Sequence, residues 1–162
     1  MRVLITGING LIGSLLRNAL GQTHTVYGLD REGEFSEQIL SADISDYAQV
    51  AQAVQQFKPL DSIIHLAGNP KVDASWESVL KANIIGTRNL FEAAREFQVP
   101  QVVYASSNHV TGAYHGFEPS LYKYTEPGPP MISPEDPIRP DSDYGLSKAF
   151  GEAVARYYFD RW

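Results

Sequence analysis

A strand-like run, a glycine turn and an apolar helix open the chain, and this combination constrains the fold most. Residues 2–6 (Arg-Val-Leu-Ile-Thr) have the composition of a strand, and residues 7–13 (Gly-Ile-Asn-Gly-Leu-Ile-Gly) follow directly. Apolar residues then recur at helical spacing up to Leu20, and Gly21 can end the helix. A strand that passes through a glycine turn into a helix is typical of the first half of a βαβ unit with parallel strands.

The glycines of this turn fit a nucleotide site. Gly7 allows a tight turn, Gly10 lets a pyrophosphate approach the backbone, and Gly13 lets the helix pack close to the strand. Free amide groups and the helix dipole then favour phosphate. The spacing is G-x-x-G-x-x-G, not the commoner G-x-G-x-x-G, and an ordinary glycine-rich turn is the alternative. We predict that the turn binds a dinucleotide through Gly7, Asn9, Gly10, Leu11, Ile12 and Gly13.

Asp30 indicates which dinucleotide the turn binds. It follows a second predicted strand, residues 25–29, at about the 20-residue spacing at which a carboxylate binds the adenosine ribose. A carboxylate repels a 2′-phosphate, so NAD is favoured over NADP. Arg31 is the counter-argument, because a guanidinium can bind that phosphate. A simple turn residue is the alternative for Asp30, but we predict NAD, with Asp30 and Arg31 near its adenosine.

Strands and helices alternate through the rest of the chain. Further strands are predicted at residues 38–42, 61–66 and 101–105. Further helices are predicted at 45–59 with Ser45 as the cap, at 75–97, and from a cap at Ser142 or Asp143 to the end. This alternation predicts an α/β fold, a doubly wound parallel sheet of Rossmann type with strand order 3-2-1-4-5. Residues 1–162 would form one nucleotide-binding domain. Residues 112–141, which hold seven of the ten prolines, would form a loop on the substrate side.

Polar or small residues follow three more of the predicted strands. Asp43 and Ile44 follow the third strand, where they can flank an adenine, and residues 66–68 follow the fourth. Residues 106–109 follow the fifth strand, where a capped strand exit is the alternative. Ligands of a doubly wound sheet bind at this edge. The predicted site therefore also includes Asp43, Ile44, Leu66, Ala67, Gly68, Ser107, Asn108 and His109.

Tyr144 and Lys148 lie four residues apart on the last predicted helix and therefore on one face of it. A nearby ammonium favours the phenolate and so lowers the pKa of a tyrosine, which makes the tyrosine a usable general base. The spacing alone is weak evidence, because an exposed pair on any helix has the same pattern. Its agreement with the glycine turn and the polar strand ends makes a catalytic pair the better interpretation.

The composition argues against several classes of protein. The net charge is −6 with no basic cluster, so we expect no nucleic-acid partner. The chain has no cysteine, and its four histidines lack metal-ligand spacing, so we expect neither disulfides nor a metal site. No apolar run has the length of a membrane span, and no secretory signal is visible. We therefore expect a cytoplasmic protein without a membrane partner.

Taken together, these motifs resemble the extended short-chain dehydrogenase/reductases, also called the NAD-dependent epimerase/dehydratase family. The resemblance extends along the whole chain and includes Asn83 in Lys-Ala-Asn-Ile-Ile-Gly. Residues 105–109 (Ala-Ser-Ser-Asn-His), together with residues 144–148 and Gly-Glu at 151–152, are most similar to the uronate dehydrogenases and to NAD-dependent sugar and sugar-phosphate dehydrogenases. Epimerases typically have Val-Tyr-Gly after the serines, where this chain has Val-Thr-Gly at 110–112.

The resemblance implies roles for the residues that match. Tyr144 would remove a proton from a substrate hydroxyl, while Lys148 would lower the tyrosine pKa and bind the nicotinamide ribose. Ser107 would hold the substrate oxygen. Hydride would pass to NAD from the carbon that carries this hydroxyl, C1 of a cyclic sugar. Asn108 and His109 would bind sugar hydroxyls, although a histidine that only packs the loop is an equal alternative for His109.

Two other polar residues each have two possible roles. Asn83 belongs to the predicted cofactor set, although bracing of its helix against the fourth strand is the more typical role of such a residue. Lys71 can serve a substrate phosphate or carboxylate, and a solvated lysine is the alternative.

Family members continue beyond the last helix with a further strand and a smaller lobe that completes the substrate pocket, whereas this chain ends at Trp162. We therefore expect the fifth strand to be a sheet edge and turnover by this chain to be weak or absent. A nucleotide-sugar epimerase or dehydratase that retains its NAD is a second hypothesis, and a non-catalytic NAD-binding module is a third. The resemblance also implies a homodimer through helices 75–97 and 143–160.

Overall fold

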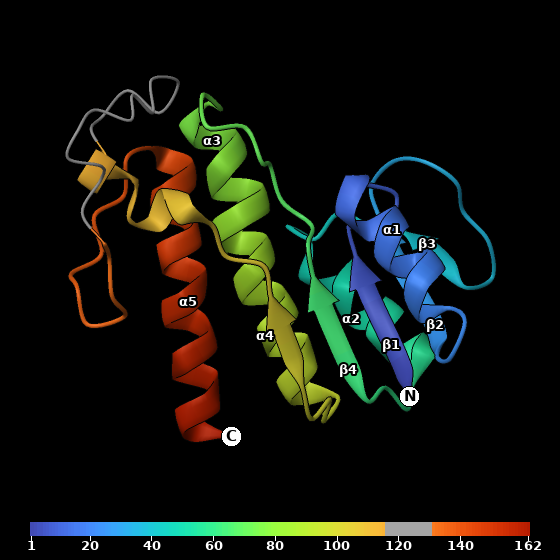
Figure 1. Cartoon of the computed structure of the whole chain (residues 1–162). Helices are drawn as coiled ribbons and strands as arrows, with labels where there is room; N and C mark the ends of the chain where they lie inside the picture. The colour runs from blue at the N-terminus through green and yellow to red at the C-terminus, as the bar shows by residue number, and fades with distance from the viewer. Residues whose placement is uncertain (116–130) are drawn as a thin grey trace.

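The computed structural model describes residues 1–115 and 131–162, which contain a five-stranded parallel sheet (Figure 1). The sheet order is β3-β2-β1-β4-β5, so the predicted doubly wound α/β fold is confirmed. The strands are β1 Arg2–Thr6, β2 Thr25–Asp30, β3 Ile39–Ser41, β4 Ser62–His65 and β5 Val102–Tyr104.

The helices cover the two faces of the sheet unequally. Helix α1 packs on one face against β1 and β2, whereas α2 and α4 lie together on the other face and α5 packs beside α4 and β5 (Figure 1). The helical segments are α1 Leu11–Leu20, α2 Tyr47–Phe57, α3 Trp76–Val79, the π-helical η1 Leu80–Ile85, α4 Gly86–Glu96, the 3-10 helices η2 Asn108–Val110 and η3 Gly112–His115, and α5 Asp143–Arg161.

The central strand β1 is buried on both faces. Leu4 belongs to the core between the sheet and the helices α2 and α4, and Val3 and Ile5 belong to the core beneath α1. Leu4 and Ile5 are both 0% exposed. A strand buried on both faces needs apolar residues in a continuous run, not in alternation, which explains the composition of residues 2–6.

Helix α1 contacts the sheet with only part of its apolar surface. Leu16 and Leu20 pack against the core, whereas Leu11, Ile12 and Leu15 are 84%, 57% and 65% exposed. The helix instead approaches the sheet at Gly13, where a Cβ would lie 2.1 Å from the carbonyl oxygen of Gly7. The apolar spacing therefore predicted the helix, but not the narrow stripe that it buries.

The long helix predicted at residues 75–97 is not uniformly α-helical. Ser75 caps its start by accepting a hydrogen bond from the Ser78 amide, but residues 80–85 form the π-helical segment η1 between α3 and α4. The apolar spacing fits an α-helix throughout and gives no sign of this change. Such π segments are rare and frequently lie at functional sites. This one carries Asn83, which is 2% exposed.

One of the two predicted helix caps is wrong by one residue. Asp46, not Ser45, caps α2, since its carboxylate accepts hydrogen bonds from the amides of Ala48 and Gln49. Ser45 instead donates from its hydroxyl to Asp43. For α5 the predicted alternatives were Ser142 and Asp143, and it is Ser142 that accepts a hydrogen bond from the Gly145 amide at 3.0 Å.

Strand β5 is the edge of the described sheet, as predicted, and Val103 on it is 47% exposed. Residues 116–130 of the predicted proline-rich loop lie outside the described residues, and residues 112–115 form η3. In the part of the chain that the structure describes, no helix has both the length and the apolar character needed to cross a membrane.

Candidate functional site

The glycine turn packs directly against the backbone that leaves β4. Gly7 has a φ of 73°, and a Cβ on it would lie 2.9 Å from the Ala67 amide nitrogen. Gly10 caps α1 in an extended conformation without a side-chain hydrogen bond. A helix start capped in this way offers its first amide groups to an anion. The turn therefore has the shape and the donors that a phosphate group needs.

Asp30 is held beside this turn by backbone amides. Its Oδ2 accepts a hydrogen bond of 2.8 Å from the Asn9 amide, and its Oδ1 accepts one of 2.8 Å from the Arg31 amide. Asn9 donates in turn from its side chain to the carbonyl of Glu32. The Arg31 guanidinium lies 3.3 Å from the Glu32 carboxylate, with both side chains mostly exposed. A carboxylate is therefore fixed at the turn, and the guanidinium is not.

Asp43 and Ile44 are anchored near the start of α4. The amide and the hydroxyl of Ser45 both donate to Asp43 Oδ1, and these hydrogen bonds lower the pKa of the Asp43 carboxyl. The Ile44 side chain is 8% exposed and lies against Gly86, where a Cβ would meet its Cδ1 at 2.6 Å. Asn89 donates to the Ile44 carbonyl at 3.0 Å. Contact of these two residues with an adenine stays a prediction.

Residues 65–68 form the end of β4 and the segment after it, which lies against the glycine turn. His65 is 1% exposed, and its ring nitrogens lie 2.7 Å from Thr6 Oγ1 and 3.1 Å from Thr87 Oγ1. Burial, with the Lys148 ammonium as a smaller cause, lowers the His65 pKa to about 3, so the ring is neutral. Thr6 Oγ1 also accepts from the Ala67 amide. This network was not predicted, because no pattern in the sequence indicated a role for His65.

Leu66 and Gly68 flank Ala67 in the segment that follows β4. The Leu66 amide donates to the Thr6 carbonyl at 3.2 Å, and Gly68 has a φ of 158° with Asn83 against it. Lys71, a little further along, has an exposed side chain, and its amide donates to Asn69 Oδ1. Among residues 1–115 and 131–162, no cluster of three histidine, aspartate or glutamate side chains could hold a metal ion.

Asn83 joins the exit of β4 to α5. Its Oδ1 accepts from the Asn69 amide at 2.7 Å, while its Nδ2 donates to the Asn69 carbonyl at 3.0 Å and to Ser147 Oγ at 2.9 Å. Both ends of the amide are therefore used within the protein, which is the bracing role weighed above. Its contact with a cofactor stays a prediction. Asn69 and Ser147 were not predicted, because only the fold brings them to Asn83.

Tyr144 and Lys148 share one face of α5, as their spacing predicts. The Lys148 Nζ lies 5.7 Å from the centre of the Tyr144 ring and 5.0 Å from that of Tyr104. It donates a hydrogen bond of 2.8 Å to the Ala105 carbonyl at the end of β5. The lysine is 7% exposed, and this burial lowers its pKa to about 8. A buried cation next to a tyrosine ring is suited to stabilising a phenolate.

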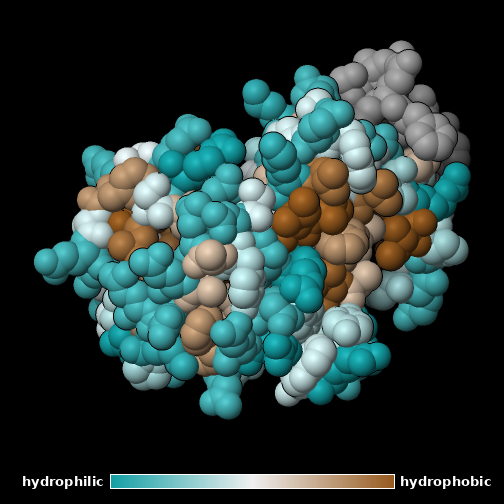
Figure 2. Space-filling model, turned by 180° about the vertical axis from the view of Figure 1, so that it is seen from behind, coloured by the Kyte–Doolittle hydropathy of each residue, from teal (hydrophilic) through white to brown (hydrophobic). Residues whose placement is uncertain are grey.

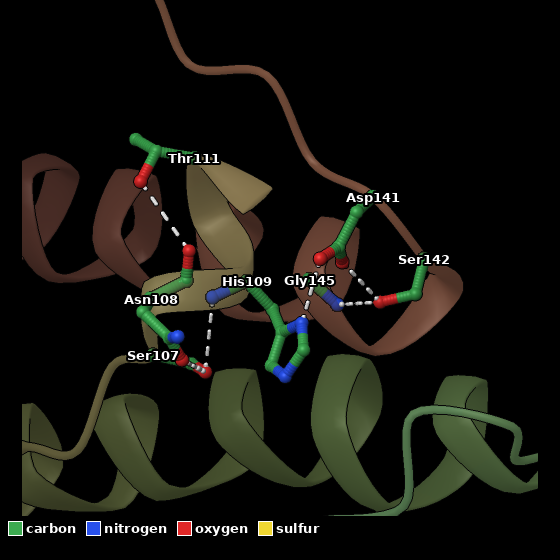
Figure 3. Close-up of polar contacts among 7 residues, drawn as sticks. All are labelled: Ser107, Asn108, His109, Thr111, Asp141, Ser142 and Gly145. Atoms are coloured by element: carbon green, nitrogen blue, oxygen red, sulfur yellow. Dashed lines mark hydrogen bonds and ion pairs between the residues drawn. The ribbon is translucent and has the colours of Figure 1, made fainter. Parts of the chain in front are cut away.

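Residues 107–109 lie against the same end of α5 (Figure 3). Ser107 Oγ accepts from the His109 amide at 3.2 Å and donates to Asn108 Oδ1 at 3.4 Å. The His109 ring meets the Tyr144 ring edge-on, with the centres 5.6 Å apart. Its Nδ1 lies 2.7 Å from Asp141 Oδ2. No sequence pattern indicated Asp141, which belongs to the proline-rich segment.

The buried Lys148 predicts a pH-dependent stability. Its pKa is lowered from 10.5 to about 8 in the folded protein, so between these values the unfolded chain binds more of the proton and stability rises with pH. Lys148→Met lacks this dependence. Between pH 7 and about pH 9.5, the unfolding free energy of wild type should therefore rise by about 2 kcal/mol more than that of the variant, measured by urea denaturation. Lys81→Met, at an exposed site, is the control, and a pH-independent difference for Lys148→Met would contradict the prediction.

Comparison with known proteins agrees with this geometry. Residues 3–162 match the model of the NAD dependent epimerase/dehydratase family. The chain is 37% identical over 99% of its length to L-arabinose 1-dehydrogenase (NAD(P)(+)) of Haloferax volcanii, and 35% identical over 98% to the NAD-dependent glucose-6-phosphate dehydrogenase of that organism. It spans 62% and 63% of the length of these two relatives.

A solved structure supports the same family. A variant of uronate dehydrogenase from Agrobacterium tumefaciens, in complex with NAD, superposes with a TM-score of 0.83 at 34% identity, covering 99% of this chain and 57% of that one. The sheet order, the glycine turn and the matches over nearly the whole chain lead to one conclusion. The chain belongs to the NAD-dependent epimerase/dehydratase family, the extended short-chain dehydrogenase/reductases.

Proposed function

We propose that this chain is the cofactor-binding and catalytic part of an NAD-dependent dehydrogenase that oxidises a hydroxyl of a sugar, a uronate or a sugar phosphate at C1. One observation carries the proposal. A tyrosine beside a buried lysine lies on α5 against Ser107 and His109, at the same sheet edge as the glycine turn. The relatives named above are dehydrogenases of an arabinose, a uronate and a glucose phosphate, which supports a sugar substrate.

The glycine turn and Asp30 fit NAD. Glycine at positions 7, 10 and 13 lets a phosphate approach the backbone of the turn, and the Asp30 carboxylate favours a free ribose hydroxyl over a 2′-phosphate. When bound, NAD supplies the acceptor for the hydride. The residues that would hold it are Gly7, Asn9, Gly10, Leu11, Ile12, Gly13, Asp30, Arg31, Asp43, Ile44, Leu66, Ala67, Gly68, Asn83, Tyr144 and Lys148.

Tyr144 acts as the general base in this proposal. Its phenolate oxygen takes the proton of the substrate hydroxyl, and the Lys148 ammonium, 5.7 Å from the ring, stabilises the negative charge. With a pKa of about 8, Lys148 is mostly charged at pH 7. The Ser107 hydroxyl donates to the substrate oxygen and holds it beside Tyr144. Loss of the hydride from C1 and of the proton from its hydroxyl oxygen converts a cyclic sugar into a lactone.

The site residues fit a substrate with a charged group as well as a neutral sugar. Lys71 has an exposed ammonium that can meet a phosphate or a carboxylate, but a neutral sugar would leave it in water.

We also propose that the enzyme is cytoplasmic, since the cysteine-free composition suits a reducing compartment.

Tyr144→Phe removes the proposed base and nothing else. We expect the rate of NAD reduction to fall at least about 10²-fold with glucuronate, L-arabinose or glucose 6-phosphate, whichever is oxidised fastest, while the Kd for NAD changes little. Absorbance of NADH is followed for this chain and for a chimera that continues into the carboxyl-terminal part of uronate dehydrogenase. Tyr157→Phe, exposed on the same helix, is the control.

Two outcomes would contradict the assignment. Unchanged turnover in Tyr144→Phe would remove Tyr144 from the chemistry, and a large loss of NAD binding would mean that its main role is to hold the cofactor and not to take the proton. An epimerase or dehydratase that retains its NAD is the alternative within this family. Such an enzyme would convert a nucleotide sugar without net formation of NADH, and a non-catalytic module would bind NAD without converting any sugar.

Asp30→Asn tests the preference for NAD. The amide keeps the shape and can accept from the Asn9 amide, but it no longer repels a phosphate. We expect the ratio of the Kd for NADP to that for NAD to fall by about tenfold or more in calorimetric titrations. Glu37→Gln, at an exposed position, controls for the loss of one negative charge. A ratio unchanged from wild type would mean that Asp30 does not face the ribose.

We also propose that the protein is a homodimer. Apolar side chains gather on the face formed by the helices from α3 to α5 (Figure 2). On these helices Trp76, Ile85, Leu146 and Tyr157 are 43%, 40%, 47% and 48% exposed. An apolar face on two adjacent helices is self-complementary under two-fold symmetry, because the same patch meets its copy.

Light scattering tests the dimer directly. We expect twice the mass of one chain for wild type and a shift toward the single-chain mass for Ile85→Glu, because a carboxylate would be buried in the interface. Leu11→Glu places the same charge on the exposed face of α1, away from the proposed interface, and should leave the mass unchanged. A single-chain mass for wild type would refute the homodimer.

A further inference from the structure

A buried carboxylate lies beneath His109 and has no role in the proposal above. The Asp141 side chain is 1% exposed, although most of the described residues just before it are exposed. Its Oδ2 lies 2.7 Å from His109 Nδ1, and its Oδ1 accepts a hydrogen bond of 2.8 Å from Ser142 Oγ (Figure 3). A charge is costly to bury unless hydrogen bonds satisfy it, and here each oxygen has a donor within reach.

Two glycines make room for this carboxylate and its histidine. A Cβ on Gly112 would lie 1.9 Å from Asp141 Oδ2, and a Cβ on Gly145 would lie 2.3 Å from the His109 carbonyl oxygen. Ser142, which bonds to Asp141, also caps α5 through the Gly145 amide. The Asp141–His109 pair is therefore built into the start of the helix that carries Tyr144 and Lys148.

The carboxylate determines the protonation of the ring. An ionised carboxylate only accepts hydrogen bonds, so His109 Nδ1 must carry the proton that lies between them. In the neutral ring, Nε2 then has a lone pair and accepts. Nε2 points away from Asp141 (Figure 3), and no hydrogen bond to it is found within the described residues. Because the ring is edge-on to Tyr144, this acceptor lies beside the proposed base.

We propose that Asp141 is a positioning residue that fixes His109 as the Nδ1–H tautomer, so that His109 Nε2 accepts a hydrogen bond from a hydroxyl of the sugar substrate. The identity of the ligand rests on the proposed function, but the tautomer does not. A carboxylate or phosphate of the substrate is repelled at this position, since Nε2 presents a lone pair and Asp141 a negative charge. An anionic group must therefore bind elsewhere in the pocket.

Nuclear magnetic resonance of histidine-labelled protein tests the tautomer without any substrate. In ¹⁵N spectra at pH 7.5, the ring that disappears in His109→Gln is His109. We expect wild type to have its proton on Nδ1, and Asp141→Asn to increase the population of the Nε2–H form by about tenfold or more, because the amide no longer requires a proton on Nδ1. Asp143→Asn, exposed in the first turn of α5, should leave the spectrum unchanged.

Three results would overturn the proposal. They are a neutral Nε2–H ring in wild type, a doubly protonated ring in wild type, and a tautomer that Asp141→Asn does not alter. Circular dichroism shows whether Asp141→Asn is folded. If it is not, the wild-type spectrum decides alone, because a ring without a lone pair on Nε2 cannot accept a hydroxyl.

Kinetics test the hydroxyl contact. For the best substrate among glucuronate, L-arabinose and glucose 6-phosphate, Asp141→Asn should lower kcat/KM by about tenfold or more while the Kd for NAD changes less than about twofold. Asp143→Asn should retain wild-type kinetics, and an equal loss in both variants would contradict the role of Asp141. If none of these sugars reduces NAD with the unsubstituted protein, either as this chain or as the chimera described above, the proposed function fails, and the spectra still decide the tautomer.

Discussion

The site depends on the close approach of two strand exits. Gly7, at the end of β1, packs against the backbone of Ala67, at the end of β4, with no room for a Cβ between them. Behind this contact, His65 lies within hydrogen-bond distance of Thr6 and Thr87, which joins both strands to α4. Because parallel strands end at one edge, this junction brings the glycine turn and the α5 pair to the same side of the sheet.

Two buried charges lie near the proposed base. Lys148 is desolvated beside Tyr104 and Tyr144, and Asp141 is buried beneath His109, whose ring meets Tyr144 edge-on. Burial lowers the pKa of Lys148 to about 8, so the folded protein disfavours the charged lysine even though its Nζ donates to the Ala105 carbonyl. A buried lysine with a perturbed pKa is typical of a functional site, where its cost in stability is offset elsewhere in the fold.

The sequence predicted the parts of this structure that local patterns determine. The glycine turn, the strand order and the shared face of Tyr144 and Lys148 follow from spacing, which the backbone geometry converts directly into position. The π-helical segment around Asn83 and the buried Asp141 were missed, because each depends on partners far away in the chain. No pattern in a single sequence brings Asn83 to Ser147, 64 residues later.

A crystal structure of this chain with NAD tests the central claim most directly, because the claim is that one sheet edge assembles the cofactor cradle and the base. We predict the pyrophosphate against residues 7–13, the adenosine ribose at Asp30, and the nicotinamide ribose within hydrogen-bond distance of Lys148 and Tyr144. NAD bound with its nicotinamide away from α5, or bound outside the glycine turn, would contradict the account.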